Sequence, residues 1–312
     1  MNRRQAGSPL AIEKLRIALP MAPHAGLLHL AAARGFFDDR GLAVTVLAQS
    51  HGKAALAEVL RGGADLAAAA DVPIVVEVLK GAPLSIAAAV ASASNELAVL
   101  ARRDRAIGSP ADLQGRRVGV TLGTSGEYFL WAFMVRHRLA PQSLTLVDLP
   151  PARLVQALRD GSVDAIAAWQ PIRHEAEVAL ASAVVSLSAP DAYAQNYVLV
   201  GRSEFLATHS EALRRLLLAL LDAERFVQEE PQQAKALLAA RLKLSTEALD
   251  PAWQALTLEV GQEQAQLVTL EDVAGWAMAR GYAPAQPMPN FLAHLDLEAL
   301  QAASPGRVTV VR

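Results

Sequence analysis

Residues 15–47 read LRIALPMAPHAGLLHLAAARGFFDDRGLAVTVL, and they set a pattern that much of the chain repeats. Apolar residues predict a strand over 15–19, a helix over 27–37 and a second strand over 42–47. Gly35 and Gly41 mark the end of the helix. A strand, a helix and a strand at this spacing are typical of a right-handed crossover unit in a parallel sheet.

The alternation continues to about residue 95, restarts after residue 104 and gives way to long helices after residue 208. One of these helices is predicted from Asp250-Pro251 to about Gln264. The pattern predicts an α/β protein of two lobes, each with a mixed, mostly parallel sheet flanked by helices, and a cleft between them. The expected division is a flexible tail at 1–14, a first lobe of 15–103 plus 198–312, and a second lobe of 104–197.

The composition of the 312-residue chain excludes several classes of protein. Hydrophobic residues make up 53%, which is enough for a sizeable core and rules out a mainly disordered chain. The lack of cysteine excludes disulfides, thiolate nucleophiles and cysteine-bound metals. The 29 Lys and Arg residues against 31 Asp and Glu leave no basic excess, so nucleic acid is not expected as a partner.

The sequence also lacks a run of about 20 apolar residues, which a membrane-spanning helix would need. Arg3 and Arg4 could open a secretory signal, but Gln5, Ser8 and Glu13 interrupt any apolar core behind them. The expectation from these residues is a chain without an export signal, which leaves a cytoplasmic location open.

Five loops that follow predicted strands form the candidate site, because ligands of open parallel sheets bind beyond the carboxyl ends of the strands. These loops are residues 20–26, 49–53, 70–71, 121–126 and 169–171. Several open directly onto a helix, as at Thr124-Ser-Gly-Glu127, where the residues predict a capping box. The N-terminus of a helix offers free N–H groups and a positive dipole end, so the loops predict a site for an anionic or polar ligand.

Each of these loops also has a purely structural interpretation. Thr124 and Ser125 are residue types that cap helices. Gly52 and Gly123 suit tight turns, and Asp71 suits the start of a helix. Their convergence on one edge of two sheets favours a site. The seven histidines show no metal-binding spacing, and no nucleotide-binding loop or nucleophile elbow occurs, so we expect no catalytic residue, metal or cofactor.

Several motifs resemble those of the solute-binding proteins of nitrate, sulfonate and taurine ABC importers. Residues 31–42, AAARGFFDDRGL, are similar to the opening of these proteins. Residues 107–121, IGSPADLQGRRVGVT, resemble the entry to their second lobe, and 123–125 match the loop that follows. Residues 164–171, DAIAAWQP, resemble a further element of the family. The resemblance extends from about residue 15 to the closing segment at 305–310.

The resemblance implies a type II periplasmic-binding-protein fold that holds a small solute between two hinged lobes. It further implies an ABC permease and an ATPase as partners and a periplasmic location. We also expect a monomer. The ligand-binding residues that it implies, together with the loops above, are His24, Ala25, Gly26, Ser50, His51, Gly52, Asp71, Thr121, Gly123, Thr124, Ser125, Trp169, Asn196 and Tyr197.

The expected solute is a small anion or zwitterion, such as a sulfonate, taurine, nitrate or a carboxylate. A zwitterionic solute is among the expected ligands because the Asp71 carboxylate could bind an ammonium group. Two alternatives remain: an enzyme of the same fold, acting on a ligand such as a thiamine-pyrimidine precursor, and a ligand-sensing module. The related thiamine-pyrimidine synthases use a cysteine-rich segment, and the lack of cysteine in this chain argues against that activity.

Overall fold

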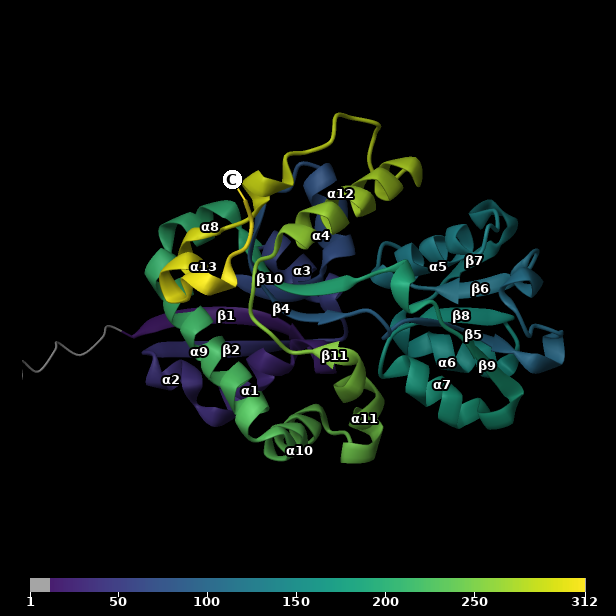
Figure 1. Cartoon of the computed structure of the whole chain (residues 1–312), viewed down its shortest axis with the longest axis horizontal. Helices are drawn as coiled ribbons and strands as arrows, with labels where there is room; N and C mark the ends of the chain where they lie inside the picture. Colours follow the sequence, from purple (N-terminus) through teal and green to yellow (C-terminus); the bar gives the residue numbers. More distant parts are fainter. Residues whose placement is uncertain (1–11, 312) are drawn as a thin grey trace, which may run out of the picture.

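The computed structural model describes residues 12–311, which form two mixed sheets flanked by helices (Figure 1). The first sheet has the order β11-β4-β10-β3-β1-β2. Its strands are β1 (Glu13–Pro20), β2 (Leu42–Gln49), β3 (Leu66–Ala70), β4 (Leu84–Ala93), β10 (Gln195–Arg202) and β11 (Leu256–Thr257). The pairs β1–β2 and β1–β3 are parallel, whereas β10 runs antiparallel to both β3 and β4. The predicted strand, helix and parallel strand at the start of the chain are therefore confirmed.

The helices of the first lobe cover both faces of this sheet (Figure 1). On β1, Ile17 belongs to the apolar core beneath α1 and α9, and its neighbour Ala18 to the core beneath α3 and α4. The α-helices are α1 (Gly26–Arg34), α2 (Phe36–Asp39), α3 (Gly52–Leu60), α4 (Asp71–Leu79), α8 (Ser203–Thr208), α9 (Ser210–Glu229), α10 (Pro231–Leu242), α11 (Thr246–Ala255), α12 (Gln264–Ala279) and α13 (Glu298–Ala303). Shorter 3-10 helices are η1 (Pro23–Ala25), η7 (Phe291–His294) and η8 (Pro305–Arg307).

The second sheet has the order β7-β6-β8-β5-β9, in which β6 is parallel to β7 and β8, and β5 is antiparallel to β8 and β9. Its strands are β5 (Ala98–Arg102), β6 (Arg117–Val120), β7 (Thr145–Asp148), β8 (Ala165–Ala168) and β9 (Val184–Leu187). Its helices are α5 (Ser125–Arg136), α6 (Pro151–Asp160) and α7 (Ile172–Leu180), with 3-10 helices η2 (Arg103–Arg105), η3 (Pro110–Leu113), η4 (Pro141–Ser143), η5 (Ala181–Ala183) and η6 (Pro190–Ala192).

Strand pairing differs by a few residues from the expected boundaries of the lobes. The strand β5, which we assigned to the end of the first lobe, pairs in the second sheet. The whole of β10 pairs in the first sheet, although 195–197 were assigned to the second lobe. At the other end, β1 begins at Glu13, inside the predicted tail, and residues 1–11 of that tail lie outside the described residues. The division into lobes at 103/104 and 197/198 stays a prediction.

The predicted helix from Asp250 to about Gln264 is wrong. The helix α11 begins earlier, at Thr246, because the Ser245 side chain caps it by accepting a hydrogen bond from the Ala248 N–H. It ends at Ala255, where β11 pairs antiparallel with Ala93 and its neighbour at the end of β4. Pro251, which we expected in the first turn, lies inside the helix.

An apolar core joins the two lobes beside the cleft. Tyr128 of α5 packs edge-on against Trp276 of α12, with ring centroids 5.3 Å apart, and against Tyr193 at 4.8 Å. The helix α12 in turn packs on α4 of the first lobe (Figure 1). The lobes therefore meet through packed side chains as well as through the chain segments that cross between them.

Candidate functional site

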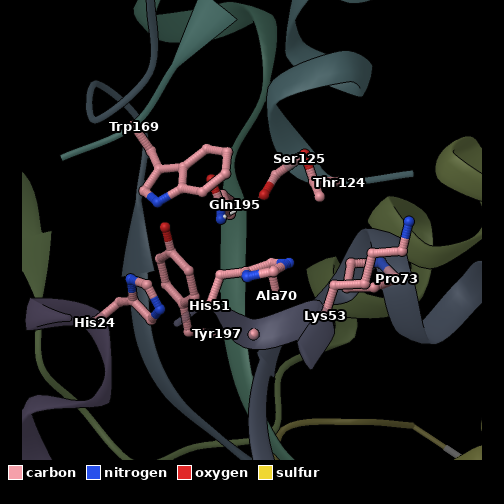
Figure 2. A pocket seen from close by; sticks show the side chains of 11 residues that line it. His24, His51, Lys53, Ala70, Pro73, Thr124, Ser125, Trp169, Gln195 and Tyr197 are labelled. Carbon is pink, nitrogen blue, oxygen red and sulfur yellow. Dashed lines mark hydrogen bonds between the residues drawn. The ribbon is translucent and has the colours of Figure 1, made fainter. Parts of the chain in front are cut away.

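A small cavity lies between the two lobes, and both sheets contribute to its wall (Figure 2). The first lobe supplies residues that follow β1, β2 and β3, together with two side chains of β10. The second lobe supplies the start of α5 and the residue after β8. The lining residues are His24, His51, Gly52, Lys53, Ala70, Pro73, Thr124, Ser125, Trp169, Gln195 and Tyr197.

Three helices begin at this cavity: α3 at Gly52, α4 at Asp71 and α5 at Ser125. The first N–H groups of a helix have no acceptor within the helix, and the helix dipole places partial positive charge there. Asp71 is the first residue of α4, and its carboxylate offsets the positive end of that helix. Because α3 belongs to the first lobe and α5 to the second, positive potential still reaches the cavity from both sides. This arrangement suits an anion.

The start of α5 differs from the predicted capping box. Thr124 is the N-cap residue, but its hydroxyl donates to the Thr121 carbonyl oxygen at 2.7 Å and caps no helical N–H. Glu127 accepts a hydrogen bond from the Gly123 N–H at 2.8 Å, one residue earlier than a capping box requires. Gly123 has φ of 68°, a conformation that favours glycine, so the loop before α5 is a tight turn. The hydrogen bond to Gly123 keeps the Glu127 carboxylate outside the cavity lining. Inside the cavity, this carboxylate would repel an anion.

The wall of the first lobe carries two histidines that are neutral at pH 7. His24 stacks on Tyr197 with ring centroids 4.0 Å apart, and burial lowers the pKa of His24 to about 3. Burial and the nearby Lys53 ammonium also lower the pKa of His51. Because neither ring is protonated, both can donate or accept hydrogen bonds, depending on the tautomer.

Three sets of hydrogen bonds cross the cleft around the cavity. Lys53 of α3 donates to the Leu122 carbonyl oxygen at 2.8 Å, and the Gln195 amide of β10 donates to Ser125 Oγ at 3.0 Å. The third set centres on the buried Glu127. Its carboxylate accepts from Arg280, at 3.1 Å, and from the hydroxyl of Tyr282, both of which follow α12. The two lobes are thus in contact on several sides of the cavity.

Two buried carboxyl groups lie behind the wall of the cavity. Asp71 accepts hydrogen bonds from the Tyr193 hydroxyl and the Asn196 N–H, and burial raises its pKa to about 6. Glu96 accepts from the Tyr197 hydroxyl, and burial raises its pKa to about 7. Glu96 fixes Tyr197, which lines the cavity, whereas Asp71 fixes Tyr193, which packs on Tyr128 outside the lining.

The structure brings half of the predicted ligand-binding residues together at the cavity. The residues that line it are His24, His51, Gly52, Thr124, Ser125, Trp169 and Tyr197. The residues outside its lining are Ala25, Gly26, Ser50, Asp71, Thr121, Gly123 and Asn196. That any of them binds a solute stays a prediction.

The residues outside the lining have other contacts. The Thr121 hydroxyl donates to the Leu149 carbonyl oxygen at 2.7 Å, and Ser50 Oγ lies 2.8 Å from His51 Nδ1. Gly26 lies close to the side chains of Leu238 and Leu258. A Cβ atom added at this position would come within 3.1–3.3 Å of them.

Four residues that line the cavity were absent from the predicted set: Lys53, Ala70, Pro73 and Gln195. Lys53 and Ala70 lie on loops that the sequence had already selected, so only their side-chain direction was unknown. No pattern in the sequence pointed to Gln195, because this residue begins an antiparallel strand and the rule about the carboxyl ends of parallel strands does not apply to it.

Within residues 12–311, no cluster of three or more His, Cys, Asp or Glu side chains could hold a metal ion. Over the same residues, no helix has the length and apolarity that a membrane crossing requires.

The fold and the cavity define a two-lobed α/β protein with its candidate site between the lobes. The chain belongs to the NMT1/THI5-like family, whose profile matches residues 22–234. A curated protein of Brucella abortus (strain 2308), a candidate binding protein by its name, is 24% identical over 171 residues. That match covers 54% of each protein, so the chain spans about half the length of the curated relatives it matches.

Solved structures share the fold over most of the chain. The alkanesulfonate-binding protein SsuA from Xanthomonas axonopodis pv. citri, bound to MOPS, has a TM-score of 0.78 at 19% identity, covering 92% of this chain and 99% of that protein. The periplasmic nitrate-binding protein NrtA from Synechocystis PCC 6803 has a TM-score of 0.77 at 13% identity, covering 95% and 89%. These likenesses confirm the predicted periplasmic-binding-protein fold.

Proposed function

We propose that this protein is the solute-binding component of an ABC importer and that it captures a small anionic or zwitterionic solute between its lobes. The observation that carries the proposal is the convergence of α3, α4 and α5, which all begin at one interlobe cavity. A helix N-terminus stabilises an anion by about 0.3–1 kcal/mol when exposed and up to about 2 kcal/mol when partly buried. The termini of α3 and α5, which begin without an acidic first residue, together favour an anion over a neutral solute of the same shape.

The side chains at the cavity support an anionic group on the solute. Ser125 Oγ accepts a hydrogen bond from Gln195, so the Ser125 hydroxyl hydrogen is free to donate to a solute. The Lys53 ammonium adds a positive charge at the same wall. Of the described residues that line the cavity, none carries a carboxylate, so no lining side chain opposes an anion.

The proposal extends to location and partners through the relatives. The names of the structural neighbours describe periplasmic binding of sulfonate and nitrate, and one of them assigns its binding protein to a sulfonate ABC transporter. We propose the periplasm, an ABC permease and ATPase, and a monomeric state for this protein. We propose binding without turnover, as the names of the structural neighbours describe binding proteins.

Isothermal titration calorimetry with nitrate and ethanesulfonate tests the proposal. The variant is Ser125→Ala, and the matched control is Ser210→Ala, because both serines are the first residue of a helix and Ser210 is exposed on α9. The wild-type protein and the control should bind at least one anion equally well. Ser125→Ala should bind it about tenfold more weakly, since a hydrogen bond to a charged group contributes about 1.5–3 kcal/mol.

Failure of both anions to bind the wild-type protein would contradict the proposal, and so would unchanged affinity in Ser125→Ala. Native mass spectrometry of the purified protein adds a second test, because it reports the subunit number and the mass of any retained solute. A dimer would contradict the proposed monomer.

A further inference from the structure

The side-chain amide of Gln195 is half satisfied inside the cavity. Gln195 is buried, and its Nε2 donates to Ser125 Oγ at 3.0 Å. Its Oε1 is also buried, but it has no hydrogen-bond partner among the described residues. A buried acceptor without a donor is costly, so a solute that donates to Oε1 would remove that cost on binding.

The position of this acceptor relates it to the anion site. Figure 2 shows the Gln195 side chain between Trp169 and Ser125, beside the first turn of α5. Ser125 therefore contacts Gln195 on one side and has a hydroxyl hydrogen free for an anion on the other. A solute bound at the start of α5 would reach Gln195 with a donor group only a few bonds from its anionic group.

The charges around the cavity favour a neutral donor over an ammonium group. Lys53 and the N-termini of α3 and α5 make the cavity positive, and the buried His24 ring is neutral. Asp71 and Glu96 lie behind the wall, where Tyr193 and Tyr197 already donate to them. An ammonium group would lose its water here without a carboxylate in contact, which is unfavourable.

We infer that the cavity selects small anions that carry a neutral hydrogen-bond donor, such as a hydroxyl or an amide N–H, near the anionic group, and that it discriminates against ammonium-bearing anions. Gln195 is the residue that determines this preference. The inference rests on the proposed function and narrows it to one class of solute.

Three sulfonates with the same carbon skeleton test the inference in calorimetric titrations: ethanesulfonate, 2-hydroxyethanesulfonate and taurine. They differ only in a hydrogen, a hydroxyl or an ammonium group at the end of the chain. The hydroxyl compound should bind the wild-type protein about tenfold more tightly than ethanesulfonate, because it satisfies Gln195 Oε1. Taurine should bind at least tenfold more weakly than the hydroxyl compound.

Two variants of Gln195 test whether this residue causes the preference for the hydroxyl compound. Gln195→Leu should bind ethanesulfonate and the hydroxyl compound equally, since it removes the acceptor. Gln195→Glu places a carboxylate at the same position, so taurine should gain at least tenfold relative to the hydroxyl compound. Gln301→Glu adds the same charge at an exposed position of α13 and should leave the order of the three affinities unchanged.

The outcomes separate this inference from the proposed function. If ethanesulfonate binds but the wild-type protein fails to prefer the hydroxyl compound, or if taurine binds as tightly as the hydroxyl compound, the inference is wrong and the anion site stands. If neither nitrate nor any of the three sulfonates binds, the proposed function fails and the inference fails with it. The wild-type series decides between these outcomes even where a Gln195 variant does not fold.

Discussion

Asp71 and Glu96 are both fully buried behind the cavity, and each accepts a hydrogen bond from a tyrosine hydroxyl, but they differ in their remaining contacts. Asp71 also accepts from the Asn196 N–H at 3.2 Å. Glu96 has one carboxyl oxygen without a hydrogen-bond partner among the described residues. The pKa of Asp71 is raised by burial to about 6, and that of Glu96 to about 7.

In both groups burial raises the pKa, and hydrogen bonds to the carboxylate oppose that rise. Both groups have 0% exposure, so the same physical cause raises both pKa values. The additional N–H donor stabilises the ionised form of Asp71, whereas Glu96 depends on Tyr197 and on the more distant charge of Arg173. Near pH 7 Asp71 is therefore mostly ionised and Glu96 only about half ionised.

The largest expected effect is on the pH dependence of stability. Between pH 4.5 and about 7, Glu96 keeps its proton in the folded state and loses it in the unfolded state, so the free energy of unfolding falls as pH rises. The decrease is about 1.4 kcal/mol per pH unit, or roughly 3 kcal/mol over this window. Urea denaturation at several pH values should show that Glu96→Gln lacks this decrease relative to the wild-type protein.

Asp71→Asn is the matched variant for this measurement. It should remove the part of the decrease between pH 4 and about 6 that belongs to Asp71, and keep the part between pH 4.5 and about 7 that belongs to Glu96. His24, with its lowered pKa, contributes in the opposite direction, but it is common to all three proteins and cancels in the differences. If the free energy of unfolding had the same pH dependence in all three proteins, the two carboxyl groups would not be the source of the decrease in stability.

A second prediction concerns the tyrosines. At pH 8, Tyr197→Phe should lower the free energy of unfolding by about 2 kcal/mol, because the ionised Glu96 loses its hydroxyl donor inside the protein. Tyr193→Phe should cost less, since Asp71 keeps the Asn196 N–H. Thermal and urea denaturation of both variants measure the difference, and a larger loss in Tyr193→Phe would reverse our comparison of the two sites.

The smallest expected effect appears when a solute binds. An anion in the cavity disfavours the ionised form of Glu96 behind Tyr197, so binding at pH 7 should take up a fraction of a proton, at most about half. Calorimetry with ethanesulfonate in buffers of different ionisation enthalpy measures this uptake. Glu96→Gln should abolish it, and equal uptake in that variant would assign the proton to another group.

Much of the fold could be predicted from the sequence, because local patterns are strong where buried strands alternate with helices. Residues 42–47 were predicted as a strand and lie within β2 (Leu42–Gln49). The segment at 250–264 could not be predicted, since the short strand β11 forms only through its pairing with β4. The α11 helix likewise depends on a cap at Ser245, which looks like an ordinary loop serine in the sequence.

The candidate site was predictable to the level of loops but not of side chains. The loops after β1, β2 and β8 and the loop before α5 do meet at the cavity, as parallel-strand topology requires. The direction of Asp71 depends on Tyr193 and Asn196, more than 100 positions away in the chain, so no local pattern reveals it. Gln195 enters from an antiparallel strand, whose amino end reaches the edge that parallel strands reach with their carboxyl ends.

The packing of α5 against α12 has a consequence for the calorimetry of solute binding. A motion that opens the cavity by separating these helices exposes the rings of Tyr128 and Trp276 to water. Exposure of apolar surface raises the heat capacity, and its burial lowers it. A small polar solute that closes the lobes should therefore bind with a negative heat-capacity change that exceeds what its own few carbon atoms could account for, and Trp276→Ala should diminish that excess.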